Sequence, residues 1–174
     1  LKTKKEDAMS TVSLLEKYGW HEWLCHSNFS FLLGASHPHE LYEQAQSYSY
    51  QGIGLCDFDG LYGIVRMYRA KKKRKHPHGP KIYYGVEFHL EQDHQKHTSH
   101  QHTIVLYPRT LKGYQSLCHL VDIAHQGGKH HAYLPIHYLR AADRDDLVAI
   151  LPMRGIMWSL SKNPTPADFV TTAK

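Results

Sequence analysis

Apolar and polar positions alternate along this chain in short blocks that predict strands and helices in turn. Brief apolar runs predict strands at 23–25, 52–56, 82–88, 103–107 and 147–151. Between them, apolar residues recur at spacings of three and four, which predicts helices over 10–18, from Pro38, from Leu61 and after Thr110. Strands that alternate with helices indicate an α/β fold with mostly parallel strands.

The same spacing predicts which side of each helix is buried. The expected apolar positions are Leu41, Ala45 and Tyr48 in the first helix, Leu61, Ile64, Val65 and Tyr68 in the second, and Leu111, Tyr114, Leu117, Cys118 and Val121 in the third. Pro38 suits the first position of a helix, and Thr110 suits an N-cap.

The two ends of the chain suggest a fragment of a longer protein. Thr165, Pro166 and Asp168 have the pattern of a helix start, yet the sequence stops at Lys174. We expect residues 1–19 to form a lead-in helix and residues 20–174 to form part of one domain, with strand edges left unpaired.

Composition narrows the class of protein. A hydrophobic fraction of 41% indicates a folded chain, and no apolar run approaches the length of a membrane span. The charged first residues lead into no secretion signal. Cys25, Cys56 and Cys118 form no CxxC pair and fit a reducing cytoplasm, where buried thiols are ordinary core residues. The net charge of +5 is compatible with nucleic-acid binding.

Most of the 16 histidines give no metal-binding pattern. Five of them lie in or beside the polar stretch after the third predicted strand, and we interpret them as exposed residues of a hairpin loop: His89, His94, His97, His100 and His102. His130 and His131 follow two glycines and are also interpreted as loop residues.

Several sequence blocks, in their order and spacing, resemble the motifs of one family. The blocks are Glu22–Ser36 with the following turn and helix to Leu41, Gly54–Gly63, Tyr84–Phe88, His102–Tyr107 and Gly113–Leu117. They resemble the PHP (polymerase and histidinol phosphatase) domain at the N-terminus of bacterial DNA polymerase III alpha subunits, of the replicative or the error-prone branch. This resemblance implies a partial irregular β/α barrel that is truncated at its C-terminus.

The resemblance also implies a metal site, and this chain departs from it. The family's ligand positions fall on Leu24, His26, Asp57, Phe58 and Glu87, and two of these side chains cannot bind a metal. His26, Asp57 and Glu87 are therefore either relics held by hydrogen bonds or a weak site for a single Zn, Mn or Mg ion. The expectation is an impaired site.

A run of cations ends the second predicted helix: Lys71, Lys72, Lys73, Arg74 and Lys75. Cations also favour the C-terminal end of a helix, so a solvated helix end explains the run as well as a contact with DNA phosphates does.

These features predict a structural and docking module of a DNA polymerase, in the cytoplasm and away from membranes. Its partners would be the remainder of the polymerase chain and, through it, DNA. The alternative is a metal-dependent phosphoesterase or a 3′–5′ proofreading exonuclease, against which Leu24 and Phe58 argue. A DNA-binding module is a third alternative and rests on the cationic run alone.

Overall fold

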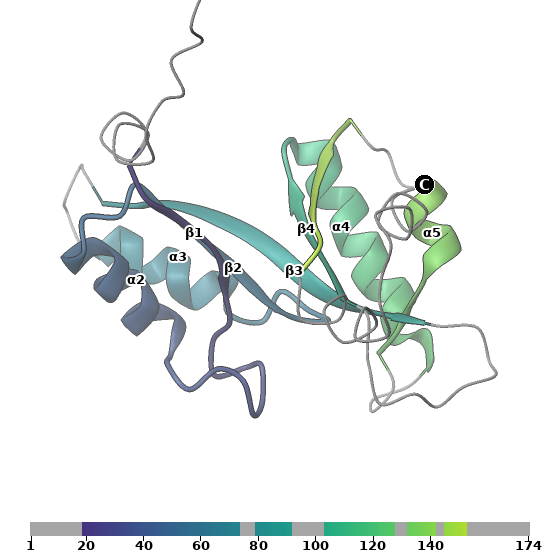
Figure 1. Ribbon diagram of the computed structural model, residues 1–174, viewed down its shortest axis with the longest axis horizontal. Helices are drawn as coiled ribbons and strands as arrows, with labels where there is room; N and C mark the ends of the chain where they lie inside the picture. The colour runs from purple at the N-terminus through teal and green to yellow at the C-terminus, as the bar shows by residue number, and fades with distance from the viewer. Residues whose placement is uncertain (1–18, 74–78, 92–102, 128–131, 142–144, 153–174) are drawn as a thin grey trace, which may run out of the picture. The chain divides into compact units, whose positions relative to one another are not determined.

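The computed structural model describes residues 19–73, 79–91, 103–127, 132–141 and 145–152 (Figure 1). The chain divides into two compact units, Leu1–Leu55 with Tyr62–Tyr83 and Cys56–Leu61 with Tyr84–Lys174. The helices expected over 10–18 and from Thr165 lie outside the described residues.

The first unit is built on two parallel strands and two helices. Strand β1 (His21–Cys25) pairs in parallel with the start of β2 (Gly52–Phe58), with His21 opposite Gly52 and Cys25 opposite Leu55. Helices α2 (Pro38–Ser47) and α3 (Ile64–Lys73) pack against each other. The core of this unit consists of Tyr42, Ala45, Ile53, Leu55, Met67 and Ala70.

Helix α2 forms where the sequence predicts it, whereas α3 begins at Ile64 and Leu61 packs in the second unit instead. Both predicted faces were partly wrong. Pro38 does occupy the start of α2, and Ala45 is buried as expected. Tyr48 instead caps the C-terminus and is exposed, and in α3 the exposed Val65 and Tyr68 were expected to be buried. The buried face of α3 is instead formed by Met67 and Ala70, so it is rotated around the helix from the predicted one.

The second unit contains the remaining strands and helices. Strand β3 (Lys81–Glu91) enters it from the first unit and pairs antiparallel with β4 (Thr103–Pro108), which pairs antiparallel with β6 (Leu147–Ile150). The short β5 (Leu134–Pro135) pairs in parallel with β3. Helix α4 (Leu111–Ala124), a 3-10 turn η1 (His125–Gly127) and α5 (Ile136–Ala141) complete it.

The strands form a mixed sheet in the order β1-β2-β3-β4-β6, with β5 beside β3. The prediction of mostly parallel strands was therefore wrong at β4, which is antiparallel to both its neighbours. The short connection from β3 to β4 explains this, because parallel neighbours need a longer crossover, usually a helix. The prediction of an α/β fold is confirmed.

Helix α4 covers the sheet of the second unit through Leu117, Leu120, Ile123 and Ala124, which share a core with Val86, Phe88, Leu106 and Leu134. Thr110 is its N-cap as predicted, since its side chain accepts a hydrogen bond from the Gly113 amide. Leu111, Tyr114 and Cys118, expected on the buried face, are exposed. Among the described helices, none is both long and apolar enough to span a membrane.

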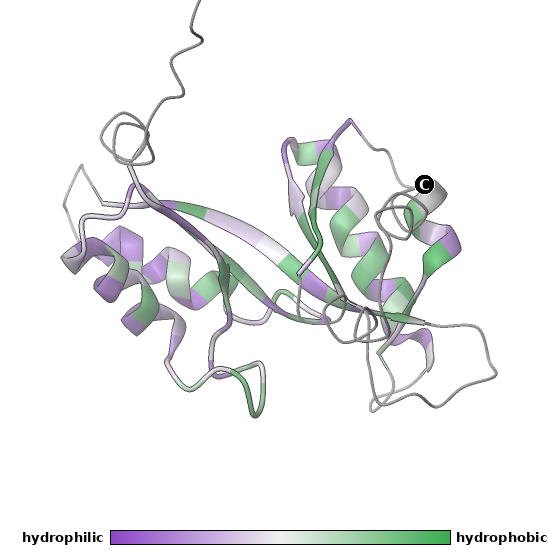
Figure 2. Cartoon of the chain, in the orientation of Figure 1, coloured by the Kyte–Doolittle hydropathy of each residue, from purple (hydrophilic) through white to green (hydrophobic). Residues whose placement is uncertain are grey.

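The loop between β1 and α2 is unusual for its apolar tip (Figure 2). Phe31, Leu32 and Leu33 are all exposed, and Leu32 has a left-handed backbone with φ of 67°. The base of the loop is closed by backbone hydrogen bonds, from Asn28 to the Ser36 carbonyl and from Gly34 to the Ser30 carbonyl, both at 2.9 Å. The loop is thus a defined turn.

Candidate functional site

The end of β2 brings buried polar side chains into the second unit. Cys56 is fully buried and Asp57 is 1% exposed. Neighbouring residues of a strand point to opposite faces, so Cys56 and Phe58 share one face and Asp57 lies on the other. The motif Cys56–Phe58 therefore presents its thiol and its carboxylate on opposite sides of the sheet.

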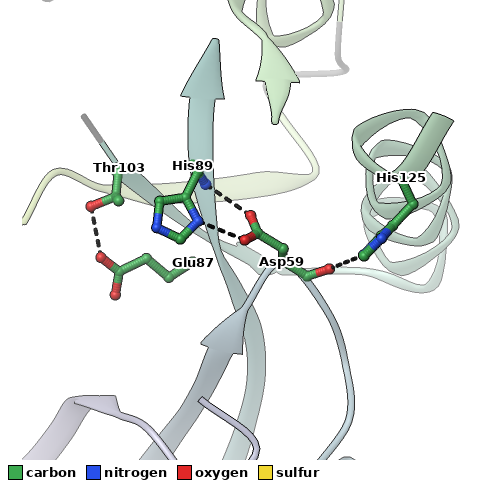
Figure 3. A network of polar contacts seen from close by, with 5 residues as sticks. All are labelled: Asp59, Glu87, His89, Thr103 and His125. Carbon is green, nitrogen blue, oxygen red and sulfur yellow. Dashed lines mark hydrogen bonds and ion pairs between the residues drawn. The ribbon is translucent and has the colours of Figure 1, made fainter. Parts of the chain in front are cut away.

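Glu87 is a fully buried acid in the middle of β3. Its neighbours Val86 and Phe88 belong to the core of the second unit, so alternation turns Glu87 to the opposite face. There it accepts a hydrogen bond from the Thr103 hydroxyl of β4, with the two oxygens 2.6 Å apart (Figure 3). A Glu87 carboxylate oxygen also lies within 4.8 Å of the Cys56 sulfur.

A carboxylate–imidazole pair joins the end of β2 to β3 (Figure 3). Asp59 follows β2 with a left-handed backbone, φ 52°. Its carboxylate accepts the His89 backbone amide at 2.9 Å and lies 2.6 Å from His89 Nδ1. The carboxylate therefore fixes both the rotamer of His89 and its tautomer, because Nδ1 must carry the proton to donate it.

Aromatic rings enclose this pair. Phe58 stacks on the His89 ring with 4.6 Å between centroids, and Tyr133 contacts the same ring edge-on. His125, at the end of α4, lies with its Nε2 2.7 Å from the Asp59 carbonyl oxygen (Figure 3). Asp59 thus connects β2, β3 and the end of α4 within the second unit.

His89 was predicted to be an exposed loop histidine, and this was wrong. It is a residue of β3 and is paired with Asp59. The other four histidines of that group lie outside the described residues. The strand simply continues beyond Phe88, where the sequence becomes polar.

The remaining predicted site residues lie in the first unit. His26 is half-buried and directly follows β1, whereas Leu24 lies within β1 and is 39% exposed. Lys71, Lys72 and Lys73 are exposed in the last turn of α3. Arg74 and Lys75 lie outside the described residues.

The donors of the second unit fit a divalent metal only in part. Carboxylate and thiolate groups are suitable ligands for zinc, and Glu87 and Cys56 are close enough to share an ion. Phe58 offers no donor, and one Glu87 oxygen is already engaged by Thr103. These groups alone do not complete the coordination of a metal ion.

The fold and these residues define an α/β domain with acidic, imidazole and thiol side chains within buried strands and just beyond the end of one of them. The PHP domain model matches residues 23–155, and the chain belongs to the PHP domain family. The motif resemblance seen in the sequence is thereby confirmed.

The relatives are much longer proteins. The error-prone DNA polymerase of Bdellovibrio bacteriovorus is 32% identical over 136 residues, which are 77% of this chain and 13% of that polymerase. The error-prone DNA polymerase of Pseudomonas syringae pv. tomato is 37% identical over 109 residues, 63% of this chain and 9% of its own length. The chain therefore spans only a small part of the polymerases that it matches.

Among solved structures, an amidohydrolase from Chromobacterium violaceum is 20% identical, with a TM-score of 0.46, over 62% of this chain and 34% of its own.

Proposed function

We propose that this chain is the PHP region of a bacterial DNA-directed DNA polymerase of the III alpha type, from the error-prone branch, acting in repair synthesis in the cytoplasm. The observation that carries the proposal is the match of 77% of the chain to 13% of an error-prone polymerase. The remainder of such a polymerase would be the partner of this module, and the module would meet DNA through it.

The test of this part is the genomic sequence downstream of the codon for Lys174. We expect it to encode a polymerase palm with its catalytic carboxylates. A stop codon there, with no polymerase gene in frame, would contradict the proposal.

Within that polymerase, the PHP region serves as a structural module with an impaired metal site. Leu24 and Phe58 stand where the family places ligands, and Phe58 stacks on an imidazole instead. Asp57 faces the other side of the sheet from Cys56 and Glu87, so the retained positions His26, Asp57 and Glu87 do not form one complete ligand set and hold at most one weakly bound ion of zinc, manganese or magnesium.

A metal-dependent phosphoesterase or a 3′–5′ exonuclease is the second candidate. It is favoured by two buried donors on one face of the sheet, Glu87 and Cys56, whose ligand atoms lie within 4.8 Å of each other. A bound metal would supply an activated water for attack on a phosphodiester.

Metal analysis and a hydrolysis assay separate the two candidates. Purified protein dialysed against Zn²⁺ or Mn²⁺ should retain well under one equivalent, and it should not shorten a single-stranded oligonucleotide faster than Glu87→Gln does. Glu87→Gln is a suitable control because a glutamine oxygen still accepts the Thr103 hydrogen bond while the ligand charge is lost. Stoichiometric metal together with hydrolysis that Glu87→Gln abolishes would establish the enzyme.

The cationic run Lys71, Lys72, Lys73, Arg74 and Lys75 is proposed to lie near the DNA that the polymerase handles. Three of its members are exposed at the end of α3, where phosphates can reach them.

A further inference from the structure

Helix α3 carries cations along its exposed face and contains no acidic residue. Met67 and Ala70 are buried in the core of the first unit, so the opposite side of the helix meets solvent. Four cations are exposed on that side, and spacings of three, four and seven place them on one stripe: Arg66, Arg69, Lys72 and Lys73. Lys71 falls at the flank of this stripe.

Helix stability does not explain this pattern. The helix dipole favours cations in the last turn, which accounts for Lys72 and Lys73 alone. Arg66 lies in the first turn, where a cation is unfavourable, and the spacings of three and four place like charges beside one another. None of the four cations forms an ion pair with a described residue, so the repulsion is left uncompensated within this part of the chain.

Exposed aromatic rings lie beside these cations. Tyr62 is 51% exposed just before the helix, and Tyr68 is 45% exposed within it. The Lys72 ammonium lies 5.0 Å from the centroid of the Tyr68 ring. At the other end, the Arg66 guanidinium lies 5.1 Å from the centroid of the Phe29 ring, which in turn contacts Tyr62.

We propose that this α3 face, defined as Arg66, Arg69, Lys72 and Lys73 with Tyr62 and Tyr68, binds single-stranded DNA. Cations neutralise the phosphates, and exposed rings stack on bases that have no pairing partner, which a duplex does not offer. The proposal rests on the proposed function for the choice of DNA as the polyanion. It goes beyond a contact by the consecutive cationic run, because Arg66 and Arg69 lie outside that run and contribute to the same face.

The test compares two variants of equal charge in the full 174-residue chain. Arg66→Gln with Arg69→Gln removes two cations of the α3 face, and Lys81→Gln with Lys112→Gln removes two exposed cations elsewhere. Binding of a fluorescent oligothymidylate is measured from low to moderate salt, with circular dichroism melting as the check on folding. We expect the α3 variant to bind at least ten-fold more weakly, and its slope of log K against log salt to fall by about 1.4, or 0.7 for each lost phosphate contact.

Three further comparisons make the proposal specific. The control pair should change affinity less than three-fold, with the slope unchanged. Tyr62→Leu with Tyr68→Leu should weaken single-strand binding several-fold without altering the slope, because stacking releases no counterions. A duplex of equal length should bind more weakly than the single strand.

Equal losses in both charge variants would overturn the proposal, as would duplex binding that is as tight as single-strand binding. A third outcome would also overturn the proposal: the chain binds vesicles that contain phosphatidylserine, the α3 variant does not, and neither binds oligothymidylate. The face would then be a membrane contact. None of these outcomes depends on what the gene encodes downstream of Lys174. A failure of the DNA-binding proposal would therefore not contradict the polymerase assignment, which is tested by the downstream sequence.

Discussion

Leu32 combines an unfavourable backbone conformation with an unfavourable exposure of its side chain. A left-handed conformation is unfavourable for any side chain with a Cβ, and here it belongs to a large apolar residue that is exposed. Two residues later, Gly34 is so close to the Ser27 carbonyl oxygen that an added Cβ would lie 2.0 Å from it. The turn therefore needs a glycine at 34 and tolerates a leucine at 32.

This contrast gives a paired prediction. Leu32→Gly should raise the free energy of unfolding by up to about 1 kcal/mol, because it removes the left-handed strain at little loss of packing. Gly34→Ala should lower it by about 2 kcal/mol or more, because the backbone itself must shift. Urea unfolding curves measure both, and similar effects of the two substitutions would contradict the described turn.

The Cys25 thiol gives a prediction about pH. Burial, with a smaller contribution from Glu22, raises the pKa of Cys25 to about 12 from an ordinary value of 9.0. In the unfolded chain the thiol ionises near pH 9 while in the folded chain it stays neutral, so its contribution to stability is complete below pH 9 and is lost as the pH rises towards 12.

Unfolding in urea at pH 8.0 and pH 10.5 should therefore show a larger alkaline loss of stability in the natural protein than in Cys25→Ser. At pH 8, iodoacetamide should also modify Cys25 more slowly than the exposed Cys118. An alkaline loss that is identical in Cys25→Ser would show that this thiol ionises normally.

At the scale of secondary structure, the sequence predicted where elements lie better than which side they bury. Apolar runs locate β2, β3 and β4 because buried strands need continuous apolar residues. Helix faces were misassigned at α3 and α4, because Val65 and Leu111 are exposed whereas Met67, Leu120 and Ile123 are buried. The apolar residues of each helix fit more than one stripe at spacings of three and four, so spacing alone does not select the buried stripe.

The candidate site was predictable only in part for a similar reason. Asp57 and Glu87 were predicted as site residues through motif resemblance, and the structure shows that both are buried in strands. The Asp59–His89 pair was missed because it joins residues 30 positions apart. It depends on the pairing of β2 with β3 and on the left-handed backbone of Asp59, which no local pattern reveals.

The N-cap of α4 offers a prediction about one element. Thr110 accepts the Gly113 amide and donates to Asp146 at 2.7 Å, so its hydroxyl connects the start of α4 to the segment before β6. Thr110→Ala should lower the free energy of unfolding by about 1 to 2 kcal/mol, whereas Thr110→Ser should change it by less than about 0.5 kcal/mol. Thermal or urea unfolding measures both, and a mild effect of the alanine would mean that the cap is dispensable.

At the scale of the whole molecule, membership of the PHP family and the loss of two ligand positions together predict how metal affinity would change if those ligands were restored. Leu24→His with Phe58→His restores imidazoles at the two positions where the family places ligands. We expect zinc affinity, measured by competition with a chromogenic chelator, to rise at least ten-fold over the natural chain.

A matched pair of substitutions controls for added histidines. Val65→His with Leu111→His places the same groups at exposed positions of α3 and α4, where they should leave affinity unchanged. No difference between the two double variants would mean that the motif alignment is wrong at positions 24 and 58.

The hydrogen bond between Thr103 and Glu87 has a consequence for how this domain changes over generations. Replacing Glu87 alone by an apolar residue removes the acceptor of the half-buried Thr103 hydroxyl, and replacing Thr103 alone removes one hydrogen-bond donor from a buried carboxylate, so either single step is disfavoured. A simultaneous exchange, such as Glu87→Leu with Thr103→Val, avoids both of these losses. Glu87 can therefore be retained during evolution even where no metal-dependent reaction depends on it. The presence of this glutamate in a sequence is thus weak evidence that a metal ion is bound.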